Sequence, residues 1–164
     1  MRRAAQGNLA AFAALVRAHE APLRRFTRRL AGEDGDDVAQ DALLASWRAI
    51  GQWRAEGSFA AWLRTIATRR YFDRRRSASG KVVYATLDEI GERGCDDSTE
   101  QRLMLEGALA ALNPRERAAA LLVFSEGHSH GEAAVILGVP LGTLKSIVAR
   151  ARAALIPLLE GASS

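Results

Sequence analysis

The sequence has a single cysteine, few prolines and no long hydrophobic run, and each scarcity excludes a class of protein. Cys95 alone cannot form an internal disulfide framework, which fits a reducing cytoplasm. No apolar stretch approaches the roughly 20 residues that cross a bilayer, so we expect no membrane insertion. Basic residues at the N-terminus have no hydrophobic segment behind them, so we expect no signal peptide. With 4 prolines and 2 tyrosines among 164 residues, a chain rich in Ala, Leu and Arg favours helices.

Enzyme motifs are also missing. The sequence contains no glycine-rich phosphate loop, no Gly-x-Ser-x-Gly and no His-Glu-x-x-His. His128 and His130 flank a serine in a predicted turn, without a third ligand nearby in sequence, which makes a poor metal site. The acidic pairs at 36–37 and 96–97 suit helix dipoles and a solvated linker better than acid–base chemistry. We therefore expect no catalytic residues, no metal, no cofactor and no small-molecule substrate.

Charge is distributed unevenly along the chain. Residues 1–77 hold 15 Lys and Arg against 8 Asp and Glu, a balance of +7, whereas residues 78–99 balance to −3 and residues 100–164 to 0. Hydrophobic residues make up 48% of the chain, enough for a folded core. We predict an all-α protein of two small helical domains, 1–77 and 100–164, joined by a flexible linker at 78–99. The basic first block favours a nucleic acid partner.

The first block has regular helix signals. Asn8 is a predicted N-cap, and Pro22 predicts that the first helix stops and restarts before Gly32. Asp36 is the predicted N-cap of a helix over 37–50. One side of that helix is apolar, and the other is polar and acidic. The polar side carries Asp37, Gln40, Asp41 and Arg48 around Leu44.

Ser58 is the predicted N-cap of a third helix over 59–76, whose second half is crowded with arginines and aromatic residues. Interleaved cations and rings are typical of single-stranded DNA binding, because cations meet phosphates and rings offer stacking surfaces. A core helix with a solvated arginine face is the alternative. The residues concerned are Arg69, Arg70, Tyr71, Phe72, Arg74, Arg75 and Arg76.

Two helices are predicted between the linker and the last motif. The first resumes near Thr99. The second starts at Asn113 as N-cap, with Pro114 at its first position and Glu116 at its third, which is a strong N-terminal signature. The predicted apolar side of the second helix extends to Phe124.

The stretch 129–155 predicts two helices joined by a tight turn. Ser129 and Glu132 have the spacing of a capping box, and Gly138 has the backbone freedom that a helix C-terminus requires. The second helix, over 141–155, has an apolar side and a polar, basic outer side, which is the pattern of a DNA-binding helix-turn-helix. An ordinary helical hairpin would give the same signals. The outer side carries Thr143, Lys145, Ser146, Arg150 and Arg152.

In this order, the motifs resemble those of the extracytoplasmic-function (ECF) sigma factors, the smallest class of bacterial sigma factor. The resemblance spans about residues 9–157 and rests on five stretches. Two of them, 58–67 and 73–76, have the family's Phe-x-x-Trp-Leu-x-x-Ile-Ala and Asp-x-x-Arg patterns. Stretch 36–48 resembles the family's acidic pair, Val-x-Gln-Glu and Ala-x-x-Trp, with Asp41 in place of Glu. Stretch 112–117, Leu-Asn-Pro-Arg-Glu-Arg, resembles Leu-Pro-x-x-x-Arg, and 137–146 resembles Leu-Gly-x-x-x-Gly-Thr-Val-Lys-Ser, with Leu144 in place of Val.

The resemblance implies a sigma region 2 domain at 1–77 and a sigma region 4 domain at 100–164. It implies an alternative sigma factor that directs RNA polymerase core to promoters and helps to melt the −10 element. The implied partners are the clamp helices and flap of the polymerase, promoter DNA and an anti-sigma factor. A sigma-like decoy that never initiates transcription and a plain helix-turn-helix repressor are the alternatives.

The resemblance also assigns roles to residues. Ile147 stands where the family often has arginine, and we expect it to touch a thymine methyl group. The residues implied to bind core polymerase are Asp37, Gln40, Asp41, Leu44 and Arg48. Those implied to bind −10 DNA are Trp62, Arg69, Arg70, Tyr71, Arg74, Arg75 and Arg76. Those implied to bind −35 DNA are Gly142, Thr143, Lys145, Ser146, Ile147 and Arg150.

Overall fold

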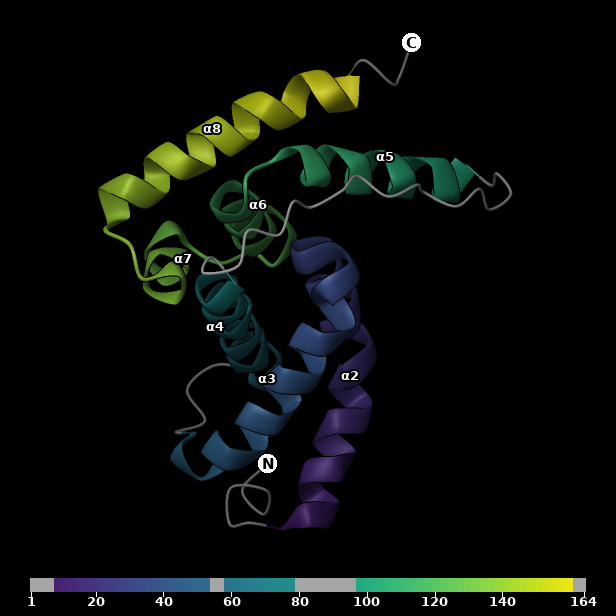
Figure 1. Cartoon of the computed structure of the whole chain (residues 1–164), viewed down its shortest axis with the longest axis vertical. Helices are drawn as coiled ribbons and strands as arrows, with labels where there is room; N and C mark the ends of the chain where they lie inside the picture. Colours follow the sequence, from purple (N-terminus) through teal and green to yellow (C-terminus); the bar gives the residue numbers. More distant parts are fainter. Residues whose placement is uncertain (1–7, 54–57, 79–96, 161–164) are drawn as a thin grey trace. The chain divides into compact units, whose positions relative to one another are not determined.

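The computed structural model describes residues 8–53, 58–78 and 97–160, and the regular structure within these ranges is helical throughout. The predicted all-α class is therefore confirmed. The chain divides into two units, Met1–Asp73 and Arg74–Ser164, which we take in turn. Most of the predicted linker, with Cys95, lies outside the described residues. The helices, labelled in Figure 1, are α2 (Leu9–Ala31), η1 (Gly32–Asp34), α3 (Gly35–Ala49), η2 (Ile50–Gln52), α4 (Phe59–Ala78), α5 (Asp97–Ala111), α6 (Pro114–Ala120), η3 (Leu121–Ser125), α7 (His130–Leu137) and α8 (Leu141–Glu160).

Helix α2 is one continuous helix of 23 residues. Asn8 caps it as predicted, because its Oδ1 accepts from the Ala11 N–H at 2.9 Å. The predicted interruption at Pro22 is wrong. A proline removes one helical hydrogen bond, but the apolar face stays buried on both sides of it, at Phe12 and at Leu23. Packing of that face keeps the helix intact.

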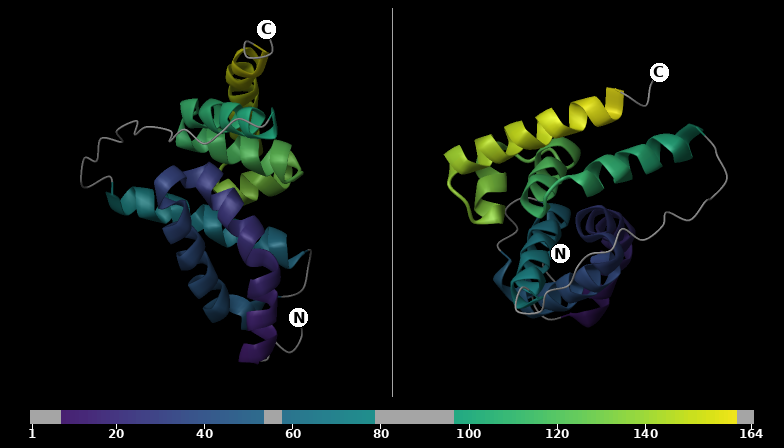
Figure 2. Two further views of the ribbon diagram at one scale, coloured as in Figure 1. Left: turned by 90° about the vertical axis from the view of Figure 1, so that its right-hand side faces the viewer. Right: turned by 45° about the horizontal axis from the view of Figure 1, so that its top comes forward.

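Helix α3 runs back along α2 from the short η1 turn, and Figure 2 shows the two helices meeting there. α3 begins at Gly35, not at Asp37, and its N-cap is Asp34, which makes no side-chain capping bond. The prediction that Asp36 is the cap is wrong because Asp36 already lies in the first helical turn. At the far end of the pair, the rings of Phe12 and Trp47 lie 4.9 Å apart.

Helix α4 starts at the predicted N-cap, since the Ala61 N–H donates to Ser58 Oγ at 3.1 Å. Its first residue, Phe59, is fully buried and lies 5.3 Å from the ring of His19 on α2. Trp53 and Trp62 pack around the same phenylalanine, with ring centroids 5.8 and 5.7 Å from that of Phe59. This aromatic cluster joins the start of α4 to α2.

In the second unit, α8 packs across α5, α6 and α7 (Figure 1). Its buried residues recur with the period of a helix, so one face of α8 supplies the core of the unit. The helix continues from α6 into η3 (Leu121–Ser125), a π-helical turn, which holds more residues than a turn of α-helix. Phe124 is therefore rotated outward and is 50% exposed, which corrects the predicted apolar side. The buried residues of α8 are Leu144, Ile147, Val148, Ala151 and Leu155.

The turns of the second unit follow the sequence closely. Ser129 and Glu132 form the predicted capping box, and Asn113, the predicted N-cap of α6, forms a second one with Glu116. Gly138 ends α7 in the left-handed conformation, with φ at 65°. α7 and α8 are bent by 102° across this turn, within the range of a helix-turn-helix. Among the described residues, no single helix is long and apolar enough to cross a membrane; α7 and α8 pass that test only as a bent pair.

Candidate functional site

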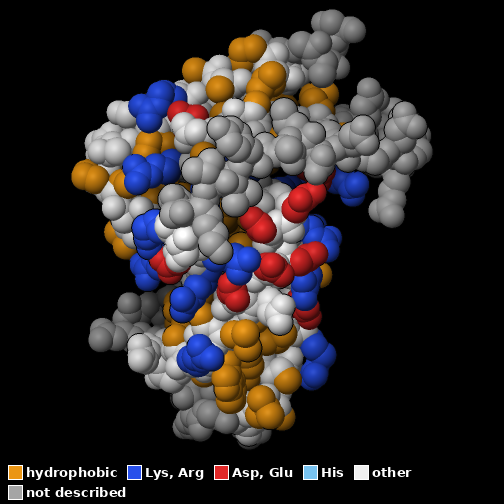
Figure 3. Space-filling view, viewed as in Figure 1, with side chains coloured by type: hydrophobic (Ala, Val, Ile, Leu, Met, Phe, Trp, Pro, Cys, Tyr) orange, Lys and Arg blue, Asp and Glu red, His pale blue; other side chains and the backbone are white. Residues whose placement is uncertain are grey.

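One side of α3 is polar and exposed, and we call it the α3 face. Its residues follow at helical spacing, so they form one stripe opposite the buried Val38, Ala39 and Ala42. Leu44, at the centre of the stripe, is 53% exposed. Figure 3 shows hydrophobic side chains gathered over the lower ends of α2 and α3, away from η1, with acidic and basic ones above them. The α3 face consists of Asp37, Gln40, Asp41, Leu44 and Arg48, all exposed or half-buried.

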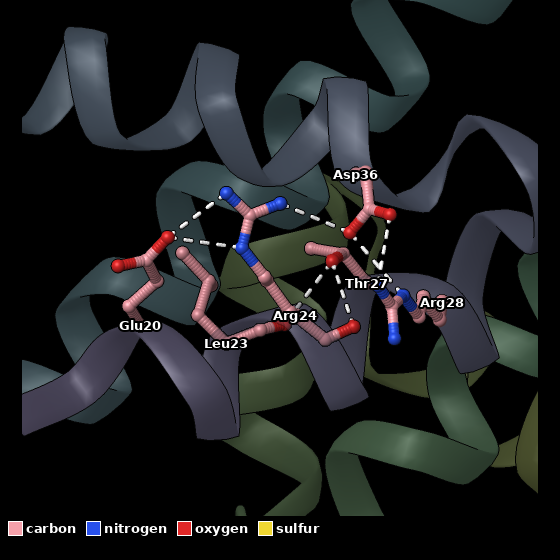
Figure 4. Close-up of polar contacts among 6 residues, drawn as sticks. All are labelled: Glu20, Leu23, Arg24, Thr27, Arg28 and Asp36. Carbon is pink, nitrogen blue, oxygen red and sulfur yellow. Dashed lines mark hydrogen bonds and ion pairs between the residues drawn. The ribbon is translucent and has the colours of Figure 1, made fainter.

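An ion-pair network fixes the start of α3 against α2 (Figure 4). Arg28 donates to Asp36 through Nη2 at 2.9 Å and through Nε at 3.2 Å. Arg24 donates to Asp36 at 3.0 Å and to Glu20 at 2.9 and 3.0 Å. We call these four residues the Asp36 clamp. The clamp orients the first turn of α3 and hence the α3 face.

The clamp acts on the ionisation of Asp36. Hydrogen bonds from Arg28, and then from Arg24, hold the pKa of this carboxyl below its usual value of 3.8. The two arginines therefore favour the ionised form of Asp36. The clamp was not predicted from the sequence, although the Glu20–Arg24 spacing of four residues is a recognisable helical pair.

Beside the clamp, the two helices are in close backbone contact at Gly35. A Cβ on this residue would stand 2.5 Å from Cα of Arg28 and 2.9 Å from the carbonyl carbon of Thr27. Thr27 is fully buried and satisfies its hydroxyl by donating to the Leu23 carbonyl at 3.1 Å. A small residue at this contact allows the clamp to close.

The second half of α4 presents the arginines predicted for DNA, and we call Arg69–Arg76 the arginine segment. Its five arginines are exposed. Arg70 forms an ion pair of 3.9 Å with Asp73 one turn along. Such a dense row of cations on one helix attracts a phosphate backbone.

The aromatic part of that prediction needs correction. Tyr71 is 5% exposed and packs against Phe72, with ring centroids 5.0 Å apart. Its ring belongs to the core, so the expectation that it stacks on a base is wrong. Trp62 is half-buried in the aromatic cluster, 6.0 Å from Trp53.

The first three turns of α8 carry the residues predicted for −35 DNA, and we call Gly142, Thr143, Lys145, Ser146 and Arg150 the α8 outer face. All five are exposed. Ser146 donates from its hydroxyl to the Gly142 carbonyl at 3.2 Å. The Arg150 Nε donates to Glu116 Oε1 on α6 at 3.1 Å. The face is thus assembled on one rigid helix, which is the arrangement of a recognition helix.

Ile147 does not belong to this face. Its side chain is 3% exposed and lies on the buried side of α8 with Leu144 and Val148. The expectation that Ile147 touches a thymine methyl group is therefore wrong. The spacing of three residues from Leu144 already places Ile147 on the apolar stripe.

Arg117 has a structural role that the sequence did not reveal. Its guanidinium donates to the carbonyls of Leu109 at 2.7 Å, Ala110 at 2.9 Å and Leu112 at 3.3 Å. These carbonyls lie at the C-terminal end of α5, where helical partners run out. Arg117 thus caps α5 from α6.

Two family models match this chain. The models of Sigma-70 region 2 and Sigma-70, region 4 match residues 15–80 and 102–155. These two matches place the chain among the sigma-70-type transcription factors, with both regions in order.

The relatives give the family. The ECF RNA polymerase sigma factor SigM of Mycobacterium tuberculosis is 35% identical over 155 residues, covering 93% of this chain and 79% of SigM. The RNA polymerase sigma factor NccH of Alcaligenes xylosoxydans xylosoxydans is 32% identical, covering 97% of this chain and 92% of NccH. The chain belongs to the family of extracytoplasmic-function sigma factors. The family resemblance is therefore confirmed, and the chain is an alternative sigma factor, that is, a transcription initiation factor.

Solved structures agree with this assignment. CnrH in complex with the cytosolic domain of CnrY superposes with a TM-score of 0.67 and 28% identity, over 98% of this chain and 94% of that chain. The sigma factor RpoE in complex with the anti-sigma factor NepR from Bartonella quintana gives 0.70 and 26%, over 93% and 98%.

Proposed function

We propose that this sigma factor gives core RNA polymerase its promoter choice through three surfaces. The α3 face binds the clamp helices of the polymerase, the arginine segment holds melted −10 DNA, and the α8 outer face reads the −35 element. The single observation that carries this proposal is the match of regions 2 and 4, in order, on one chain. The exposed surfaces lie on the helices that such an arrangement requires.

The α3 face has the chemistry of a protein interface. An exposed leucine surrounded by acidic and amide side chains offers an apolar contact with a charged rim. Charge complementarity to a basic partner would speed docking and fix its orientation. Region 4 would add a second contact, with the polymerase flap.

The DNA-binding surfaces differ in charge. The arginine segment places five cations within eight residues, which suits the phosphates of a displaced single strand. Trp62 would support this segment from the aromatic cluster. The α8 outer face offers small and hydroxyl side chains with Lys145 and Arg150, which suits contacts to base edges and phosphates of a major groove.

Regulation and place of action follow from the same assignment. Both structural neighbours were solved with a bound protein, and one of these is named as an anti-sigma factor. We propose that an anti-sigma factor also holds this chain inactive, and that the chain acts in the cytoplasm beside the polymerase. In this role it is not an enzyme and needs no cofactor.

Charge reversal on the α3 face tests the polymerase contact. Asp41→Arg should weaken binding to core polymerase by about 100-fold, because it places a cation where the partner is expected to be basic. Binding is measured by fluorescence anisotropy of the labelled full chain against core polymerase. Glu33→Arg is the matched control, since it reverses a charge in the exposed η1 turn outside the α3 face. Equal affinities for the two variants would reject the α3 face as the docking surface.

Run-off transcription with core polymerase tests the whole proposal. A promoter is first selected from a random library by the holoenzyme. Promoter-specific product identifies an initiating sigma factor, whereas a decoy or a plain repressor yields none. Asp41→Arg should abolish the product, and circular dichroism should show that its helices are retained.

A further inference from the structure

A single carboxylate joins two elements of the second unit. Glu116 stands at the third position of α6, where it completes the capping box with Asn113. Its Oε2 accepts from the Asn113 N–H at 3.4 Å, while its Oε1 accepts from Arg150 Nε at 3.1 Å. The bond to Arg150 spans 34 positions of sequence, so it links the start of α6 to the middle of α8.

The two partners differ in exposure. The Glu116 side chain is 14% exposed, whereas that of Arg150 is 62% exposed. The acceptor is therefore held in a fixed and partly desolvated position, and the donor projects from it into solvent. A charge-assisted hydrogen bond in such surroundings is stronger than one between two exposed groups.

The atom that Glu116 engages decides what the contact does. Nε lies nearest to the main chain, and the second oxygen of Glu116 faces Asn113 instead of forming a two-pronged fork on the guanidinium. The hydrogen bond to Glu116 therefore uses Nε and leaves the terminal amino groups of the guanidinium outside it. Arg150 follows Ser146 by four residues and Thr143 by seven, so it continues the stripe of the α8 outer face.

We propose that Glu116 is a positioning residue for −35 recognition: it orients Arg150 so that the terminal amino groups of its guanidinium meet the DNA. This proposal rests on the proposed role of α8 as the −35 reader. The preformed orientation reduces the side-chain entropy that Arg150 loses on binding. Glu116 itself does not contact the DNA, since a carboxylate at a phosphate backbone would be repelled.

A double-mutant cycle on the holoenzyme tests the proposal. The probe is a promoter duplex selected by the wild-type holoenzyme, compared with the same duplex whose −35 element is scrambled. Glu116→Gln keeps the capping oxygen and removes the charge, and should weaken binding to the intact probe by about fivefold. The scrambled probe should show no such loss. Arg150→Ala should cost at least as much, and adding Glu116→Gln to it should change nothing further.

Lys145→Ala is the matched control, because Lys145 lies on the same face without the contact to Glu116. Its effect should multiply with that of Glu116→Gln. A thermal melt followed by circular dichroism checks that Glu116→Gln leaves the second unit folded. If this variant loses stability, the comparison in the Arg150→Ala background still isolates the coupling.

Two results would overturn the assignment. If Glu116→Gln weakens binding equally with and without Arg150, then Glu116 does not act through Arg150. If the variant binds the intact probe more tightly, Glu116 competes with DNA for Arg150. A different failure rejects the proposed function itself: a wild-type holoenzyme that binds intact and scrambled probes equally does not read a −35 element.

Discussion

Gly35 is the residue on which the packing of α2 and α3 depends most directly. A Cβ there would meet backbone atoms of Arg28 at 2.5 and 2.7 Å, and backbone cannot move aside as a flexible side chain can. Gly35→Ala should therefore separate the helices and lower the free energy of unfolding of the first unit by about 2–4 kcal/mol. Urea denaturation followed by tryptophan fluorescence measures this unit selectively, because all three tryptophans of the chain, Trp47, Trp53 and Trp62, lie in the first unit.

Gly107→Ala is the control for this prediction. Gly107 lies inside α5, where a Cβ would meet nothing within 4 Å. Alanine should stabilise that helix by about 0.5–1 kcal/mol, since glycine is the poorer helix former. The tryptophan transition should stay unchanged. A Gly35→Ala transition that coincides with wild type would contradict the close contact.

Asp36 makes the stability of the first unit depend on pH. Because the pKa of Asp36 in the folded state lies below that in the unfolded chain, the clamp stabilises the fold above the unfolded-chain pKa and loses its effect as pH falls through the folded-state pKa. Asp36→Asn should lower the urea midpoint at pH 7, and its difference from wild type should shrink below about pH 4. Asp34→Asn serves as the control, since Asp34 makes no side-chain capping bond. A difference that stays constant down to pH 3 would argue against the clamp.

At the scale of the element, α8 has a buried side and an exposed outer side. Substitution of Ile147 tests whether this residue belongs to the buried side. Ile147→Ala should destabilise the second unit by about 2–4 kcal/mol, because the Ile147 side chain is only 3% exposed and its removal leaves a cavity in the core. Ser146→Ala, one residue earlier and exposed, should change stability by less than about 0.5 kcal/mol. Thermal melts by circular dichroism compare the two. A stable Ile147→Ala variant with altered −35 preference would restore Ile147 as a DNA contact.

Local signals in the sequence predicted the elements well, because a cap is encoded within three residues. Asn8, Ser58, Asn113 and Ser129 each cap the helix predicted for them. Signals that compete with tertiary packing were less reliable. Pro22 did not break α2, whose apolar face stays buried on both sides of the proline, and the π-helical turn η3 leaves Phe124 exposed.

The candidate surfaces were predicted from the sequence where helical spacing alone decides exposure. The α3 face, the arginine segment and the α8 outer face all lie on exposed sides of their helices. Tyr71 and Ile147 were misplaced because their burial depends on neighbouring helices. The Asp36 clamp, Gly35 and the Arg117 cap were missed for a related reason: each joins two different helices across a turn, and the periodicity of a single helix does not encode such a contact.

At the scale of the molecule, charge predicts that the two predicted domains, 1–77 and 100–164, bind DNA with unequal strength. Residues 1–77 carry a balance of +7 and residues 100–164 a balance of 0. Phosphate contacts release counterions, so each contact adds about 0.7 to the salt slope on a single strand and about 0.9 on a duplex. The salt dependence of binding therefore counts the phosphate contacts of each domain separately.

This count distinguishes the arginine segment from the α8 outer face in one holoenzyme. Replacing both Arg75 and Arg76 by alanine should lower the salt slope for a single-stranded −10 probe by about 1.4 and leave that for a −35 duplex unchanged. Lys145→Ala should do the reverse, lowering only the duplex slope, by about 0.9. Anisotropy titrations across a range of potassium chloride concentrations give both slopes. Weaker binding without a change in slope would mean that Arg75 and Arg76 act on the fold and not on phosphates, and the melted strand would then need another site on the domain 1–77.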